Sequence, residues 1–176
     1  MRTVTWVTSV CLILFGTMAM AQSVSSDYDR AANFTKYKTY AWTRGTELPD
    51  DLNHTRVVRA IDAALAGKGV ARVDAADNPD VLVAYHASFD TNLEISGATY
   101  GLGPLGFGAD RWGSATVQPV QVGTLVVDIT DARTHAVVWR GRASSDARPS
   151  DNGETREKKI NKATAKMFKN FPPTSR

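Results

Sequence analysis

The stretch LVVDITDARTHAVVWRGRAS, residues 125–144, decides the fold, because it contains a complete β-hairpin. Apolar residues alternate along its first half, at Leu125, Val127 and Ile129. This period of two is typical of a strand with one buried face. A polar turn follows at residues 131–134, and residues 136–144 read as the second strand. The residues of that strand expected on the same buried face are Val137, Trp139 and Ala143. The pattern therefore predicts an antiparallel hairpin with Trp139 in the core.

Further segments upstream also read as strands. They cover residues 22–29, 37–42, 70–73 and 80–90. The first is polar, with Val24 and Tyr28 spaced for one face of a short strand, and residues 37–42 form an aromatic, β-rich run. The clearest alternation begins at Val81 and reaches Ile95, either as a hairpin or as a bulged continuation of one strand. One more strand is expected over residues 116–122. Pro119 favours an edge position there, because proline has no N–H to donate to a neighbouring strand.

Two segments have the three- and four-residue apolar spacing of amphipathic helices. The first opens at residues 49–51 and closes at Gly67. The second follows Asp151 and Glu154, which have the spacing of a capping box, and ends at the prolines 172–173. We therefore predict the α+β class: a largely antiparallel β-sheet with two amphipathic helices packed on one face. The order of the strands does not follow from these patterns.

The N-terminal segment differs from the rest of the chain, and we predict a signal peptide over residues 1–21. It carries one charge, Arg2, followed by an apolar stretch. Small residues at Ala19 and Ala21 complete the pattern of a secretory signal that is cleaved before Gln22. We therefore expect an exported protein of the periplasm, with association to the outer membrane as an alternative.

After cleavage, residues 22–176 are expected to form one α+β domain. The one cysteine, Cys11, lies in the removed segment, so the mature chain would have no disulfide and no thiolate metal site. The whole chain has 21 basic and 18 acidic residues, a balance too even to indicate nucleic-acid binding. No apolar run after the signal approaches the ~20 residues needed to cross a bilayer.

A glycine-rich loop is predicted over residues 97–113. Gly101, Gly103 and Gly106 match the G-x-G-x-x-G pattern, but Pro104 interrupts it and no helical pattern follows, so we predict no dinucleotide cofactor. The loop also contains three large aromatic residues: Tyr100, Phe107 and Trp112. On an exposed loop they would suit contact with a partner protein or a membrane surface. Alternatively, they fold back onto the edge of the sheet.

The three histidines, His54, His86 and His135, have no metal-binding spacing, so no metal site is predicted. His86 shares a strand face with Ser88 and Asp90. Asp128 and Arg140 would join this polar face if the strands are neighbours. A hydrolase could use such a His, Ser and Asp set, although no nucleophile elbow surrounds Ser88. The simpler interpretation is a solvated face with a cross-strand pair between Asp128 and Arg140.

Four lysines recur at helical spacing in the C-terminal helix: Lys158, Lys162, Lys166 and Lys169. They lie on one stripe beside the apolar side of the helix. Such a stripe would suit an anionic envelope surface. The alternative is a solvated face whose opposite side covers the sheet.

Several stretches, in order, resemble a known family. They are residues 27–29, Phe34, 37–42, 61–65, 68–69, 80–83, 85–86, 123–141, 158–163 and 167–168. Together they are similar to the bacterial envelope family called domain of unknown function 4136, whose members are often lipoproteins of Gram-negative bacteria. The resemblance implies an exported protein and carries over no catalytic residue. Cys11 departs from the family's lipid-attachment position, which favours a free periplasmic protein.

Two functions follow from these observations. The preferred one is a non-catalytic binding or structural module of the cell envelope, whose partner is an envelope protein or an anionic envelope surface. It would need no cofactor and would not bind nucleic acid. The alternative is a small periplasmic hydrolase that uses the polar face around His86, Ser88 and Asp90.

Overall fold

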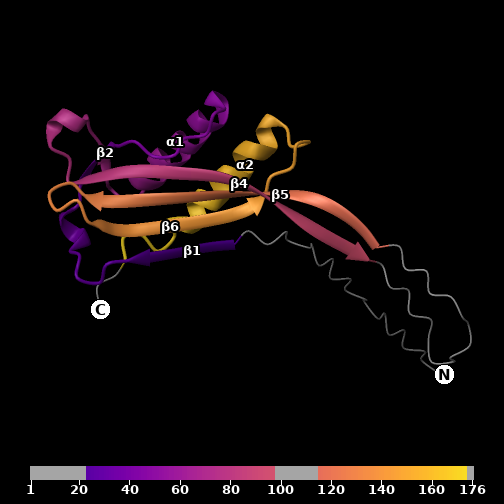
Figure 1. Cartoon of the computed structure of the whole chain (residues 1–176). Coiled ribbons are helices and arrows are strands. Elements are labelled where there is room, and N and C mark those ends of the chain that lie inside the picture. The colour runs from indigo at the N-terminus through magenta and orange to yellow at the C-terminus, as the bar shows by residue number, and fades with distance from the viewer. Residues whose placement is uncertain (1–22, 98–114, 174–176) are drawn as a thin grey trace, which may run out of the picture.

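The computed structural model describes residues 23–97 and 115–173 (Figure 1). Its strands are β1 (Ser23–Tyr28), β2 (Thr39–Trp42), β3 (Ala71–Arg72), β4 (Val81–Gly97), β5 (Ala115–Asp131) and β6 (Val137–Asp146). Its α-helices are α1 (Asp51–Ala66) and α2 (Gly153–Met167), and single 3-10 turns lie at Phe34–Lys36 and Ala75–Asp77.

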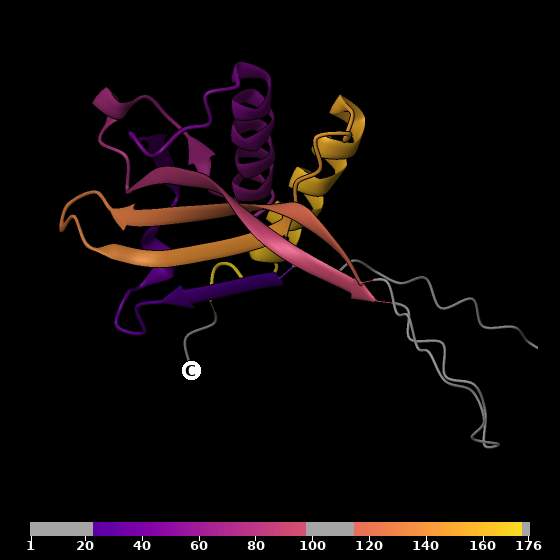
Figure 2. The same ribbon diagram turned by 45° about the vertical axis from the view of Figure 1, so that its right-hand side comes forward.

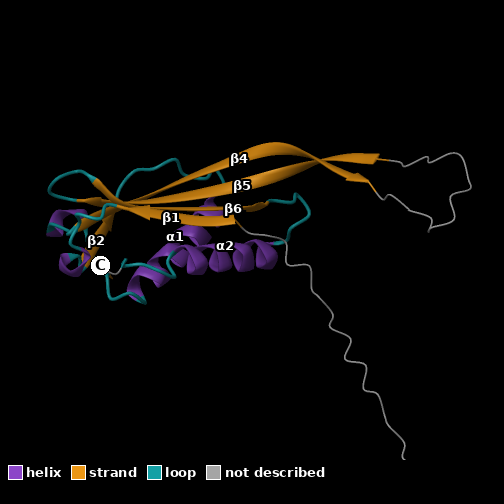
Figure 3. Ribbon diagram, turned by 90° about the horizontal axis from the view of Figure 1, so that it is seen from below, coloured by secondary structure: helices purple, strands orange, loops and turns teal. Residues whose placement is uncertain are grey.

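The strands form one sheet in the order β1-β6-β5-β4-β2-β3. β1, β6, β5 and β4 are antiparallel neighbours, whereas β2 lies parallel to β4 and to β3. The parallel pair β2 and β3 is joined by α1, because parallel neighbours need a crossover connection. Both helices lie on the same face of the sheet (Figure 3). The predicted α+β fold, with a mostly antiparallel sheet and two helices on one face, is confirmed.

β4 and β5 form a long two-stranded ribbon that extends past the rest of the sheet (Figure 2). β4 runs without a break or bulge to Gly97. Of the two predicted alternatives for its end, the hairpin is wrong. The continuation of one strand is confirmed, but that strand has no bulge. β5 pairs with β6 only from Val122 onward. Nearer the tip, β4 is the only neighbour of β5 among the described residues. Pro119 lies in this part of β5, so its predicted edge position is confirmed.

Gly123 lies inside β5 rather than between two strands. It pairs with Phe89 of β4 on one side and with Ser145 of β6 on the other. The prediction of two separate strands before and after this glycine is therefore wrong. A glycine weakens a strand but does not end it when both neighbouring strands continue past it.

A β-bulge in β6 makes one predicted core position wrong. Ile129 pairs with Trp139, and Thr130 pairs with Val137, so Val138 is an extra residue in the β6 side of the ladder. The extra residue changes which side chains of β6 face the core. Val138 and Trp139 are both buried, whereas Val137 is 46% exposed. The prediction that Val137 faces the core is wrong, and the prediction for Trp139 is confirmed.

The helix starts follow capping chemistry. Asp50 caps α1 at the predicted start. The cap of α2 is Asn152, whose side-chain oxygen accepts the N–H of Thr155. The predicted capping box is wrong by one residue, because the Asp151 carboxylate is instead bound to the ammonium group of Lys159. Within the part of the chain that the structure describes, no helix is long and apolar enough to cross a membrane.

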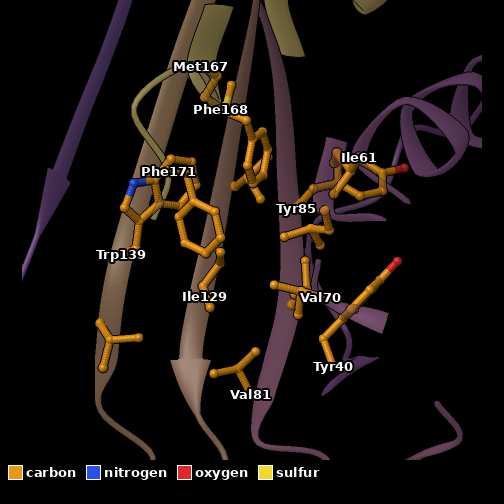
Figure 4. Close-up of a cluster of buried hydrophobic side chains, with 14 of the residues drawn as sticks. Tyr40, Ile61, Val70, Val81, Tyr85, Ile129, Trp139, Met167, Phe168 and Phe171 are labelled. Carbon is orange, nitrogen blue, oxygen red and sulfur yellow. The ribbon is translucent and has the colours of Figure 1, made fainter. Parts of the chain in front are cut away.

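The core lies between the sheet and the helices, and Trp139 is its largest fully buried side chain (Figure 4). The centroid of its ring system lies 4.8 Å from the Phe168 ring and 5.4 Å from the Phe171 ring. Both phenylalanines follow the last residue of α2, Met167, so the helix ends before the predicted stop at residues 172–173. The chain leaves the helix early because this turn places two more aromatic rings on the sheet.

Candidate functional site

A groove of about 530 Å³ opens between the sheet and the N-terminal ends of both helices. We call it the end groove. Its floor includes Ala87, Leu125 and Ala143, and its walls include Val57 of α1 and Ile160 of α2. Small-molecule sites commonly have volumes of about 300–1,000 Å³ and mostly apolar walls. The end groove therefore has the size and lining of a binding site.

Large apolar side chains are exposed at this end of the molecule. Phe89, at the mouth of the groove, is 57% exposed. Leu52, in the first turn of α1, is 68% exposed. Phe89 continues the apolar phase of Tyr85 in β4, but its side chain lies at the mouth of the groove and not in the core. Exposed apolar residues next to an apolar groove are typical of a contact surface.

Gly123 leaves space above the floor of the end groove, because it has no side chain. It pairs with Phe89, and a Cβ at Gly123 would lie 3.4 Å from the Phe89 ring and 3.5 Å from the Cβ of Ala147. A side chain at this position would therefore enter the groove.

The rim of the end groove is charged. The Lys159 ammonium group lies 2.6 Å from the Asp151 carboxylate and also donates to the backbone oxygen of Asp146. Burial alone would raise the pKa of Asp151, but the hydrogen bonds from Lys159 and from the N–H of Arg148 outweigh it and lower that pKa. Arg156 is half-buried at the groove and has no ion pair within the described ranges.

A strap, residues 43–49, connects β2 to α1 and lies along β4, and its last two residues, Leu48 and Pro49, form one wall of the end groove. The N–H of Thr46 donates to Nδ1 of His86 at 3.1 Å. The N–H of Leu48 donates to the hydroxyl oxygen of Tyr85 at 3.2 Å. These hydrogen bonds fix the strap to the sheet, so this wall is held in place before any ligand binds.

The opposite face of the sheet, which neither α1 nor α2 covers, brings three of the predicted polar residues together. Arg140 donates to both carboxylate oxygens of Asp128, at 2.6 and 2.7 Å. Nε2 of His86 lies 3.7 Å from the same carboxylate. These contacts leave Asp128 only 7% exposed. The geometry is that of a cross-strand pair between β5 and β6 with a histidine from β4 beside it.

The hydrolase hypothesis needs His86 to bridge a nucleophile and a carboxylate. In the structure, Nδ1 of His86 accepts the N–H of Thr46, and Nε2 faces Asp128. Neither ring nitrogen is directed at Ser88, and both Ser88 and Asp90 are exposed farther along β4. The structure does not bring His86, Ser88 and Asp90 into a relay.

The other histidines lie apart from this face. Nδ1 of His54 lies 2.6 Å from the Tyr85 hydroxyl, and His135 occupies the turn between β5 and β6 with a φ of 57°. Within residues 23–97 and 115–173, no group of three His, Cys, Asp or Glu residues is placed to hold a metal ion.

All four predicted lysines of the stripe are exposed. Lys158, Lys162 and Lys166 lie on α2, whereas Lys169 lies in the turn after its last residue, Met167. Lys158 forms an ion pair with Glu154 at 2.6 Å. The opposite side of the helix carries its buried residues and covers the sheet. The lysines are therefore not part of the core, and they remain a candidate contact for an anionic surface.

Several predicted features lie outside the described residues. They are the signal peptide at residues 1–21 with Cys11, the glycine motif, and the loop aromatics Tyr100, Phe107 and Trp112. Gly97, the first residue of the predicted loop, is the last residue of β4.

Sequence patterns did not predict the end groove, although two signals for it are present. Phe89 continues the apolar phase of β4 past the buried Tyr85 and the half-buried Ala87. Gly123 interrupts an otherwise β-rich run, which in a strand often marks a close approach or an open space rather than an end. No sequence pattern indicated that Arg156 lies at the groove, because its position there depends on how α2 lies on the sheet.

The comparisons with known proteins agree with this fold. The family model described as "Domain of unknown function (DUF4136)" matches residues 24–173. A DUF4136 family protein from Bacteroides thetaiotaomicron is 16% identical with a TM-score of 0.54, over 86% of this chain and 96% of that chain. The PelC dodecamer from Paraburkholderia phytofirmans is 11% identical with a TM-score of 0.51, over 84% and 96%.

A PDZ domain protein from Parabacteroides distasonis has a TM-score of 0.55 at 16% identity, but this chain covers only 36% of its length. No curated protein has a significant sequence match. At these identities the similar structures show the fold and not the function. Because the family model spans nearly all of the described chain, the protein belongs to the DUF4136 family.

Proposed function

We propose that the protein is an exported, non-catalytic binding module of the bacterial cell envelope, and that the end groove is its binding surface. The end groove carries this proposal, because it combines an apolar floor, a charged rim and the exposed Phe89 at its mouth. A groove that served only the fold would be expected to be filled, since protein interiors are close-packed.

The proposed location rests on the N-terminal pattern of residues 1–21 and on the resemblance to envelope proteins. In the periplasm, the partner would be an envelope protein or an anionic envelope surface. Beside the end groove, two further contacts belong to the proposal. They are the loop aromatics Tyr100, Phe107 and Trp112, and the lysines Lys158, Lys162, Lys166 and Lys169.

Photo-crosslinking in living cells tests the binding role of the end groove. A photoreactive phenylalanine analogue would replace Phe89, and a control protein would carry it at Val137, which is similarly exposed at 46% but lies in β6 far from the groove. We expect covalent adducts at position 89 and none at position 137. Equal labelling of both positions, or none at position 89, would contradict the proposal.

Export is tested by the intact mass of the protein recovered from the periplasmic fraction. The proposal predicts a chain that begins at Gln22 and carries no lipid, because Ala19 and Ala21 precede that site and Cys11 is removed. A cytoplasmic protein with an intact N-terminus, or a species that retains Cys11 with acyl chains, would overturn this part.

Self-assembly is a second candidate role, and the β4–β5 ribbon favours it. Between Ala115 and Val120, β5 has no second neighbour within the described chain, and such open strand edges can pair with another chain. The similar PelC structure is a dodecamer. Sedimentation of the mature protein at micromolar concentration decides this role: a single monomeric species would exclude it.

A further inference from the structure

We propose that two copies of the chain pair through the open edge of β1, antiparallel to each other about a two-fold axis at Ser26, so that their two sheets become one. This inference goes beyond the proposed function, because ligand binding at the end groove does not need a second copy. It also differs from assembly through the β4–β5 ribbon, because it uses the edge of another strand.

β1 is an edge strand without the usual protection. The sheet order places β1 at one edge and β3 at the other (Figure 1). β3 has only two residues, whereas β1 has six and pairs with β6 without a bulge. Proteins commonly protect open edges with proline, lysine, bulges or very short strands. β1 contains neither proline nor lysine, so its edge is suited to pairing with another strand.

Three residues of β1 direct their backbone groups to the open edge. The N–H of Asp29, which continues β1, donates to the backbone oxygen of Val138 in β6 at 2.9 Å. In an antiparallel pair, residues that bond to the neighbouring strand alternate with residues whose N–H and C=O point away from it. Counting back from Asp29, the residues that point away from β6 are Val24, Ser26 and Tyr28. Each of them has an N–H and a C=O to offer to a second strand.

The register follows from the sequence of β1. With Ser26 opposite its own copy, Val24 pairs with Tyr28 of the second copy, so all three outward residues are paired. A shift by two residues in one direction leaves Tyr28 without a partner in β1. A shift in the other direction places the two Asp27 carboxylates opposite each other, and like charges in that position are destabilising. The two-fold axis therefore lies at Ser26.

The side of β1 that faces the helices gains an apolar contact in this register. Val24 is half-buried against the core, and Tyr28 is 39% exposed. The Tyr28 ring is held edge-to-face against the Phe34 ring, with 6.1 Å between the ring centroids. Aromatic and β-branched side chains that lie opposite each other stabilise antiparallel strands. Two such pairs form about the axis, and they cover the tyrosine that a single copy leaves exposed.

The other side of β1 gains complementary charges. Ser25 pairs with Arg142 of β6 and, in the dimer, with Asp27 of the second copy. These residues then lie in a row across three strands, with the arginine and aspartate backbones about 10 Å apart. Arg142 is exposed and has no ion pair within the described ranges. Because the serine between them is small, the long arginine side chain can reach the carboxylate. This self-complementarity favours a second copy over a strand of another protein.

Oxidative crosslinking tests the two-fold axis. In a chain with Cys11→Ser, Ser26→Cys supplies the only cysteine. Residues that exchange both ladder hydrogen bonds have Cα atoms about 5.5 Å apart, within the range of roughly 4.4–6.8 Å for a disulfide. The matched control is Ser25→Cys, which is equally exposed in the same strand. In the proposed register its two copies are offset along the strands, with Cα atoms roughly 8 Å apart, too far for a disulfide.

We expect a covalent species of twice the chain mass for Ser26→Cys and none for Ser25→Cys, both with purified protein and in the cells that make it. Six residues per strand form a small interface, so high micromolar concentrations are used. Equal crosslinking of both variants, crosslinking of Ser25→Cys alone, or no dimer of Ser26→Cys would overturn the inference. Crosslinking of Ser26→Cys in cells only to another protein would also overturn it.

A proline variant tests the role of the open edge. The N–H of Ser26 points away from β6, so Ser26→Pro removes no bond within the sheet, and proline is tolerated at such edge positions. Sedimentation should show a dissociation constant for the dimer at least tenfold higher, whereas Ser26→Ala should change it less than twofold. Equal dissociation constants for the two variants would contradict the inference. Circular dichroism checks the fold, and the cysteine variants carry the test if Ser26→Pro does not fold. Crosslinking at Phe89 decides the proposed function independently.

Discussion

Replacement of Trp139 by alanine tests the packing of α2 on the sheet. Trp139 is 1% exposed, and its indole contacts Phe168 and Phe171 just beyond the end of α2. Deleting a buried side chain of this size removes its burial and leaves a cavity, at a cost of about 3–5 kcal/mol. For a domain of this length each kcal/mol lowers the melting temperature by roughly 2–4 °C, so we expect a drop of about 6–20 °C.

The assay is urea unfolding followed by far-ultraviolet circular dichroism, because the substitution removes one of the chain's four tryptophans and so changes the fluorescence signal itself. The matched control is Val137→Ala in the same strand, where the bulge leaves the side chain 46% exposed. We expect the control to change the free energy of unfolding by no more than about 0.5 kcal/mol. A loss of under 1 kcal/mol for Trp139→Ala, or equal losses for the two variants, would refute the placement of the bulge and of α2.

Three more predictions concern the strap, the turn between β5 and β6, and the predicted loop. Gly45→Ala should destabilise the protein by about 1–3 kcal/mol, because a Cβ would overlap the backbone oxygen of Tyr85; unchanged urea unfolding would contradict this. The hydrogen bond from Lys36, assisted by those from Tyr37 and two backbone N–H groups, holds the pKa of Asp131 well below its usual range. A carboxyl with a lowered folded-state pKa stabilises the fold above its unfolded pKa of about 4 and loses this contribution as the pH falls through the folded pKa. Asp131→Asn should therefore lower stability more at pH 7 than at pH 2.5, and an equal loss at both would oppose the assignment. Deletion of residues 98–112 leaves Gly113-Ser114 as a two-residue link between the paired residues Gly97 and Ala115. We therefore expect urea unfolding to change little and association with the proposed envelope partner to be lost. An unfolded variant would show that the deleted residues belong to the core.

The fold class could be predicted from the sequence because alternation and helical spacing report which residues are buried. The hairpin at residues 125–144 and the start of α1 at Asp50 follow from such local rules. The bulge at Val138 did not, since an extra residue in one strand is set by how the neighbouring strand pairs and leaves no local signature. The cap of α2 moved from Asp151 to Asn152 for a similar reason, because Lys159 competes for the aspartate.

The candidate site was less predictable than the fold. The grouping of His86, Asp128 and Arg140 was foreseen from strand alternation, because residues of one phase share a face when their strands are neighbours. The end groove was not, because it depends on where the helices stop covering the sheet. Phe89 has the pattern of a core residue, yet it is 57% exposed at the mouth of the groove.

Native mass spectrometry of the protein purified from the cells that make it tests the binding role of the end groove most directly. Wild-type protein and the Gly123→Leu variant would be compared under the same conditions. We predict that the wild type retains a non-covalent adduct and that Gly123→Leu does not. Wild-type protein without any adduct, or the same adduct on both proteins, would contradict the assignment of the end groove as the binding surface.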